Sequence, residues 1–237
     1  MALPKLETPT YTTIIPSTGD QVEYRPFLVK EEKILLLAQE SKSSSEITRA
    51  MKKILHACLF EKVDVGLFKP YDMEYIFLQL RAKSVGETVE VEYKCEHCDH
   101  PNQLTINLDD VKIVKPEKEV SNKIKLNDKV GMTLKHINVN DLLSPALQKA
   151  NIADVGVVES LSLMIETIYD ENEVYDVKET SKKELHEFIE SLPHTALEKV
   201  QEFATAIPKL RYETTFKCVN CGKENNIVIE GLEGFFI

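Results

Sequence analysis

The sequence is 237 residues long, with 43% hydrophobic residues, 29% charged residues and only 8 glycines. This composition predicts a globular chain that buries a core in one or two domains, and it excludes the fibrous and disordered classes. The net charge of −10 is spread along the chain, which argues against a surface dedicated to nucleic acid, because phosphate binding depends on clustered lysine and arginine. No apolar run approaches the ~20 residues needed to cross a bilayer, and residues 1–30 contain no apolar export signal.

The amino-terminal quarter predicts an extended arm and then helices. Within residues 1–28, a turn-forming Pro-Ser-Thr-Gly sequence between two extended segments predicts a β-hairpin. Residues 29–86 are expected to be helical. One helix is predicted over about residues 30–40 and a second, opened by the capping sequence Ser43-Ser44-Ser45-Glu46, reaches about Leu59. We expect Asp72 to cap a third helix with one apolar stripe: Met73, Ile76, Phe77 and Leu80.

Residues 114–209 are expected to form a separate hairpin and helical region. It opens with a charged connector and continues with a hairpin, because a turn sequence separates residues 124–126 from residues 132–136. Residues 155–168 are apolar on most sides and predict a buried helix. Two further helices are expected, one after the capping sequence that starts at Ser181 and one after Pro193.

The strongest pattern in the chain is a pair of Cys-x-x-Cys motifs, Cys95/Cys98 and Cys218/Cys221, in matching surroundings. In both, an aromatic residue and a lysine precede the first cysteine. Amide side chains follow at the fourth and fifth positions after the second cysteine, and apolar residues at the sixth and eighth. The order strand, tight turn, strand therefore occurs twice, and this arrangement is typical of a zinc ribbon. We therefore expect one structural Zn²⁺ per chain, held by these four cysteines.

Other readings of the cysteines lead to different chemistry. Redox Cys-x-x-Cys motifs usually precede a helix, whereas both motifs here precede segments typical of strands. Disulfides need an oxidising compartment, and nothing in the sequence signals export. The long separation of the motifs is unusual for a zinc ribbon, and His97 and His100 are alternative ligands. Cys58 lies on an apolar helical face and is expected to be a core residue.

The sequence contains none of the usual signatures of catalysis: no Gly-rich phosphate loop, no His-Glu-x-x-His and no nucleophile elbow. A zinc with four cysteine ligands has no open position for water, which argues against a metal-dependent hydrolase. We therefore predict a protein that is not an enzyme. The expected fold is α+β, with helical segments packed around short antiparallel hairpins. In it, residues 87–113 and 210–237 form a split zinc ribbon, and residues 114–209 are an insertion.

Two stretches before the first cysteine motif have a distinctive pattern. Residues 22–33 read VEYRPFLVKEEK, and residues 71–81 read YDMEYIFLQLR. With the Ser-rich helix start between them, these stretches resemble the baseplate hub assembly protein family of T-even-type contractile-tailed bacteriophages. The resemblance covers most of the chain, is strongest over residues 1–110, and agrees with the family in length. It supplies no catalytic residues.

The resemblance implies a non-enzymatic protein that builds the central hub of the tail baseplate in the host bacterial cytoplasm. It leaves open whether the protein stays in the virion baseplate as a structural component or departs as an assembly chaperone. The implied partners are other baseplate hub proteins, and a homo-oligomer is left open. The extended arm and the apolar residues 234–237 suit docking to partners; the alternatives are an arm that packs on its own domain and a carboxyl end that forms the last core strand.

A competing interpretation is a zinc-ribbon regulatory or nucleic-acid-binding protein of viral transcription. Lys94, Lys217 and Lys223 lie near the cysteine motifs and are placed to meet phosphates. The acidic net charge and the absence of any basic run longer than a pair argue against this class.

Overall fold

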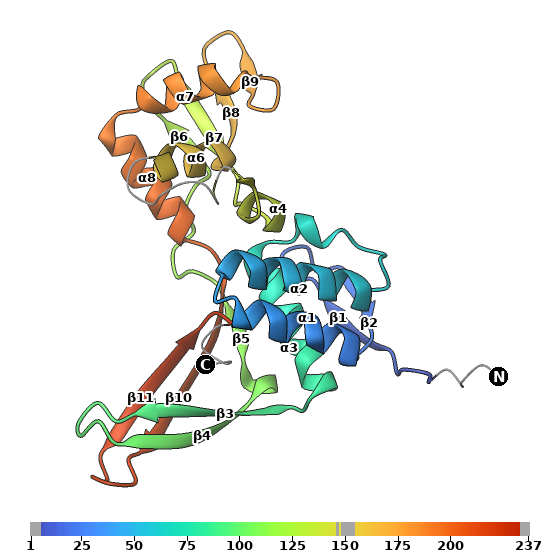
Figure 1. Cartoon of the computed structure of the whole chain (residues 1–237). Helices are drawn as coiled ribbons and strands as arrows, with labels where there is room; N and C mark the ends of the chain where they lie inside the picture. Colours follow the sequence, from blue (N-terminus) through green and yellow to red (C-terminus); the bar gives the residue numbers. More distant parts are fainter. Residues whose placement is uncertain (1–5, 146, 148–154, 233–237) are drawn as a thin grey trace, which may run out of the picture. The chain divides into compact units, whose positions relative to one another are not determined.

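The computed structural model describes residues 6–145, 147 and 155–232 of the chain, which forms two compact units. Unit 1 comprises residues 1–114 and 208–237, and unit 2 comprises residues 115–207. Both combine helices with small antiparallel sheets, which confirms the expected α+β fold (Figure 1). Part of the predicted arm (residues 1–5) and the apolar segment 234–237 lie outside the described residues.

The predicted amino-terminal hairpin is present, and it is part of the body of unit 1. Strands β1 (Tyr11–Ile14) and β2 (Gln21–Tyr24) pair antiparallel, and Tyr24 is buried. The backbone N–H of Ser17 in the turn donates to the carboxylate of Asp72 at 2.7 Å. The backbone N–H of Arg25 donates to the carbonyl of Cys58 at 3.0 Å. This hairpin is therefore fixed on the helices of its own unit.

The helices of unit 1 among the described residues are α1 (Val29–Glu40), α2 (Ser44–Cys58), the short 3₁₀ turn η1 (Val65–Leu67) and α3 (Pro70–Ser84). Helix α2 begins as its capping sequence predicts, because the Ser43 hydroxyl accepts the backbone N–H of Glu46 at 3.4 Å. Its hydrophobic face is buried, as expected of an amphipathic helix. The buried residues of α2 are Ala50, Met51, Ile54, Leu55 and Cys58.

The prediction that Asp72 is the N-cap residue of α3 was wrong: Lys69 is the N-cap residue, and Asp72 is the third residue of the helix. Proline is well suited to the first position of a helix, so α3 already begins at Pro70. From the third position the Asp72 carboxylate reaches back and accepts the backbone N–H of Lys69 at 2.9 Å. The apolar stripe is buried as predicted: Met73, Ile76, Phe77 and Leu80.

Two β-hairpins extend from these helices in unit 1 (Figure 1). The first joins β3 (Thr88–Lys94) to β4 (Pro101–Asn107), and the second joins β10 (Lys209–Lys217) to β11 (Glu224–Glu230). The 3₁₀ turn η2 (Leu108–Asp110) follows the first hairpin. Strand β5 (Lys112–Val114), which the sequence analysis did not predict, then pairs with the start of β10. Because of this pairing, the two chain segments that enter and leave unit 2 are held together within unit 1.

Unit 2 is built on one four-stranded antiparallel sheet in the order β6-β7-β8-β9. The predicted hairpin supplies its first two strands, and the helices α7 and α8 begin directly after Ser181 and Pro193, as predicted. The strands are β6 (Lys123–Lys125), β7 (Gly131–Leu134), β8 (Ile165–Tyr169) and β9 (Val174–Asp176). The labelled helices are α4 (Val139–Leu142), α6 (Val155–Met164), α7 (Lys182–Glu190) and α8 (His194–Thr205).

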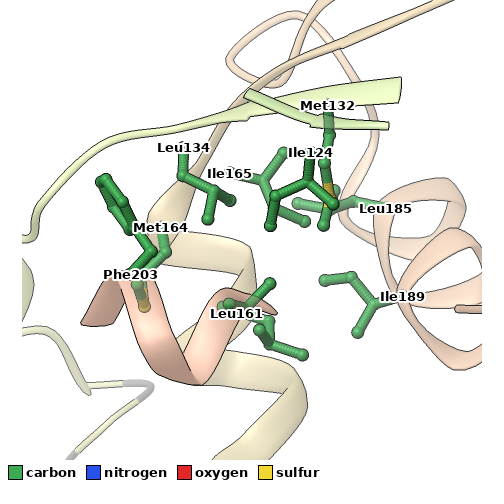
Figure 2. Close-up of a cluster of buried hydrophobic side chains, with 10 residues drawn as sticks. Ile124, Met132, Leu134, Leu161, Met164, Ile165, Leu185, Ile189 and Phe203 are labelled. Carbon is green, nitrogen blue, oxygen red and sulfur yellow. The ribbon is translucent and has the colours of Figure 1, made fainter. Parts of the chain in front are cut away.

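The single helix predicted over residues 155–168 was wrong, because α6 ends at Met164 and β8 follows without a loop. The residues after Met164 are mostly β-branched or aromatic, and these residue types favour the pleated surface of a sheet. Apolar side chains from the sheet and from α6, α7 and α8 meet in one core (Figure 2). Unit 2 thus has a hydrophobic core of its own.

Candidate metal centre

Each Cys-x-x-Cys motif forms a tight turn at the tip of its hairpin, and the two turns have the same hydrogen bonds. In the first turn, the N–H of Cys95 donates to the carbonyl of His100, and the N–H of Asp99 donates to the carbonyl of Cys95, both at 2.9 Å. In the second turn, Cys218 donates to Lys223 and Gly222 donates to Cys218, again both at 2.9 Å. The repeated sequence therefore produces a repeated structure.

The residue after the second cysteine has a left-handed backbone in both turns. Gly222 has φ +69° and Asp99 has φ +54°. Glycine adopts this conformation without steric cost, and aspartate is one of the few other residues that tolerates it. These two positions let the chain reverse directly after the cysteine and enter the next strand.

The two turns bring the four predicted cysteines together. The Sγ atoms of Cys95 and Cys221 are 3.7 Å apart, and those of Cys98 and Cys218 are 3.6 Å apart. All four sulfur atoms lie within 4.8 Å of one another. The first cysteine of each turn is thus next to the second cysteine of the other turn, so neither hairpin forms the cluster alone.

These distances fit a metal site and do not fit disulfide bonds. A tetrahedral ion with four thiolates at about 2.3 Å requires sulfur–sulfur edges of about 3.8 Å. A disulfide would bring two sulfur atoms to about 2.05 Å, and the cysteines here are free thiols. Cys95 and Cys218 are buried while Cys98 is partly exposed and Cys221 is exposed. The four cysteines can therefore hold a metal ion at the edge of unit 1.

Backbone N–H groups prepare one sulfur of each turn to carry negative charge. Desolvation alone would raise the pKa of Cys218, but the backbone N–H groups of Cys221 and Asn220 outweigh it and lower the pKa to about 6. The pKa of Cys95 is lowered in the same way: desolvation opposes the shift, and the N–H of His97 favours it. The backbone donors of each turn therefore favour the thiolate form of its first cysteine.

The second cysteine of the carboxyl-terminal turn, Cys221, has a pKa shifted in the opposite direction. The N–H of Lys223 lowers the pKa of Cys221, but desolvation and the neighbouring sulfur atoms outweigh it and raise the pKa to about 11. Full ionisation of four adjacent thiols requires a cation, because like charges at this distance disfavour one another. The donor set is therefore complete for a divalent ion that accepts sulfur ligands.

Two buried asparagines, Asn102 and Asn225, connect the turns in a reciprocal pattern that we call the asparagine clasp. The side-chain oxygen of Asn102 accepts the N–H of Val219 in the second turn, and that of Asn225 accepts the N–H of Glu96 in the first, both at 3.0 Å. Each side-chain NH₂ group donates to a carbonyl in its own turn, at 2.7 Å for Asn102 and 3.0 Å for Asn225. Both asparagines are 3% exposed.

The clasp was not assigned a role in the sequence analysis, although its signal was present. Amides at the fourth position after the second cysteine recur in both motifs. The pattern gave no reason to connect each amide with the opposite turn, because that contact exists only once the hairpins meet. The Nδ2 of Asn102 also lies 3.8 Å from the Sγ of Cys218. The clasp therefore contacts both the backbone and the sulfur atoms of the site.

The side chains of the other candidate ligands are not part of the cluster. In the described part of the chain, the group able to hold a metal consists of the four cysteines and includes neither His97 nor His100. His97 is exposed, and His100 contributes its backbone carbonyl. Cys58 is fully buried on α2, and burial raises the pKa of its thiol to about 11. This matches the core position expected for Cys58.

Among the described residues, no helix is long and apolar enough to cross a membrane.

Comparison with known proteins places these features in a family. The family described as "T4 bacteriophage base plate protein" matches residues 8–237. The chain is also 26% identical over 216 residues to the baseplate hub assembly protein gp26 of Enterobacteria phage T4, covering 91% of this chain and 92% of that protein. No solved structure matches. With a match that spans nearly its whole length, the chain belongs to the T4 bacteriophage base plate protein family.

Proposed function

We propose that this protein is a non-enzymatic baseplate hub assembly protein of a contractile-tailed phage, and that a structural Zn²⁺ stabilises it. The observation that carries the role in assembly is the similarity to the T4 hub assembly protein over 91% of the chain. The family match, over residues 8–237, includes both cysteine motifs. On this proposal the partners are other baseplate hub proteins, and the protein acts in the host bacterial cytoplasm.

The chemistry of the donor set supports zinc as the ion. Four thiolates are soft ligands, and structural sites with four cysteines and tetrahedral geometry are typical of Zn²⁺. On this proposal Cys95, Cys98, Cys218 and Cys221 are all ligands. No coordination position then remains for water, so the bound ion supplies rigidity rather than Lewis-acid catalysis. The clasp would hold both turns at the ligand spacing.

We propose a division of the chain that follows from this centre. An amino-terminal hairpin (residues 1–28) and a helical region (residues 29–86) come first. Residues 87–113 and 210–237 then form the split ribbon, and residues 114–209 form an insertion. The pairing of β5 with β10 supports this division, because it closes the ribbon where the insertion begins and ends.

The role in assembly is tested by isolating the protein from infected cells. A phage that encodes an affinity-tagged copy should yield baseplate hub proteins with the tagged chain at the stage before tails are complete. A parallel isolation from purified particles then separates a structural component, which is present there, from an assembly chaperone, which is absent. Isolation of nucleic acid or RNA polymerase instead, in a salt-sensitive complex, would contradict the proposal.

A further inference from the structure

Helix α1 exposes four residues along one side, and we call them the leucine stripe. They are Lys33, Leu36, Leu37 and Glu40, which stand at positions i, i+3, i+4 and i+7 and are therefore neighbours on one helical face. Leu36 is 53% exposed and Leu37 is 67% exposed. The two charged residues at the ends of the stripe are exposed as well.

The opposite side of α1 makes the contacts with its own unit. Helix α1 packs against α2, and its buried residues are Glu31 and Ala38 (Figure 1). Because a helix turns once in about 3.6 residues, these two residues share one face and the leucine stripe lies on the other. Adjacent apolar side chains that a chain leaves exposed in this way are typical of a surface that contacts another molecule.

The charges at the two ends of the stripe have opposite signs and are not used within the unit. In the described part of the chain, no ion pair involves Lys33 or Glu40. Glu40 is the last residue of α1, a position at which the helix dipole favours a cation and disfavours a carboxylate. The order of these charges therefore does not stabilise α1 itself.

We propose that the leucine stripe binds the same stripe of a second copy of this chain, with the two α1 helices antiparallel. A twofold axis midway between Leu36 and Leu37 places Leu36 of each copy opposite Leu37 of the other. The same axis places Lys33 of each copy opposite Glu40 of the other. In a twofold contact every pair occurs twice, so the leucines of both copies are covered and both lysines gain a carboxylate.

Other occupants fit this stripe less well. Helices that lie on a membrane surface are rich in lysine and arginine, whereas α1 has three glutamates and two lysines. A helix of another protein would need the same charges in the reverse order, which an antiparallel copy of this chain supplies without further change. The stripe is shorter than a stable interface of about 1,200–2,000 Å² requires. We therefore expect a reversible dimer that dissociates on dilution.

Charge exchange in the full-length protein tests the pairing of Lys33 with Glu40. Sedimentation velocity over a dilution series from the millimolar to the micromolar range measures the dissociation constant of the dimer. Lys33→Glu and Glu40→Lys should each weaken the dimer by about tenfold, because each replaces two attractions by two repulsions. The double variant should regain the parent affinity, because opposite charges face each other again. Added salt should weaken the parent dimer.

A polar substitution tests the apolar centre of the stripe. Leu37→Gln should weaken the dimer by about tenfold or more, because Leu37 is covered at two symmetric positions of the contact. Leu67→Gln is the matched control, since Leu67 is a leucine of η1 that is 64% exposed and lies outside the stripe. This control should keep the parent affinity. Circular dichroism checks that all variants are folded.

Four results would overturn the proposal. The first is a parent protein that stays monomeric up to millimolar concentration. The second is a double charge exchange that fails to restore the affinity, and the third is a Leu67→Gln control that weakens the dimer as much as Leu37→Gln does. The fourth is a monomeric parent that retains another phage protein, or vesicles of anionic phospholipid, and loses this binding in Leu37→Gln, which would assign the stripe to that partner.

Discussion

Replacing Cys218 by serine is expected to abolish metal binding and to separate the two hairpins of unit 1. A structural zinc site contributes about 10 kcal/mol or more of apparent binding free energy, whereas a whole domain is stable by only about 5–15 kcal/mol. Cys98 and Cys218 are 120 positions apart, and a link between such distant positions restricts the unfolded chain strongly. Limited proteolysis should therefore cut within residues 88–107 and 209–230 of the variant, and the thermal transition of unit 1 should fall.

Unit 2 is expected to resist the same protease, because it has a hydrophobic core of its own. In a phage complementation assay the variant should fail through loss of folded protein. A variant that stays as protease-resistant as the parent and yet fails to complement would contradict a purely structural role. It would instead place the cysteine turns at a surface that contacts a partner.

Cys58→Ala is the matched control for Cys218→Ser. Cys58 is buried on α2 and does not belong to the cluster of four cysteines, so the metal content should be unchanged. The free energy of unfolding should fall by about 1–2 kcal/mol, because a small buried side chain is truncated. Loss of metal from this control would mean that the ligands are assigned wrongly.

Replacing either asparagine of the clasp by leucine is expected to weaken metal binding by about 10–100-fold, the usual effect of removing a group that orients metal ligands. Asn102→Leu leaves the N–H of Val219 without its acceptor, and Asn225→Leu does the same to the N–H of Glu96. Because the clasp is reciprocal, the two variants should lose similar affinity. Competition with a chelator measures the dissociation constant, and Co²⁺ in place of the native ion reports the ligand geometry by its absorption bands.

The chain offers close controls for the clasp at the next position of each strand. Gln103 and Asn226 are also amides, and both are exposed. Gln103→Leu and Asn226→Leu should leave the affinity and the Co²⁺ spectrum unchanged. If these controls weaken binding as much as the clasp variants do, the effect comes from altered strands and not from the reciprocal hydrogen bonds.

The two cysteine turns of the candidate metal centre were largely predictable because their information is local. A Cys-x-x-Cys turn with strands on both sides has one preferred geometry, and the sequence contains it twice. The helices opened by Ser43 and Ser181 were predictable for the same reason, because a capping residue acts on N–H groups within its own turn. The stripe on α3 was predictable because helical periodicity places its residues on one face.

The errors arose where distant segments decide the structure. Residues 165–169 form β8 because β7 offers them a pairing edge, although apolar character alone is also compatible with a longer helix. Strand β5 is too short to be recognised without its partner β10. The reciprocal contacts of Asn102 and Asn225 join residues more than a hundred positions apart. No local pattern specifies such contacts.

Elemental analysis of protein purified without chelator, combined with X-ray absorption at the metal edge, tests the central claim most directly. We expect one equivalent of zinc per chain, surrounded by four sulfur atoms at about 2.3 Å. Folded protein that contains no metal, and in which Cys95, Cys98, Cys218 and Cys221 all react freely with a thiol reagent, would contradict the claim.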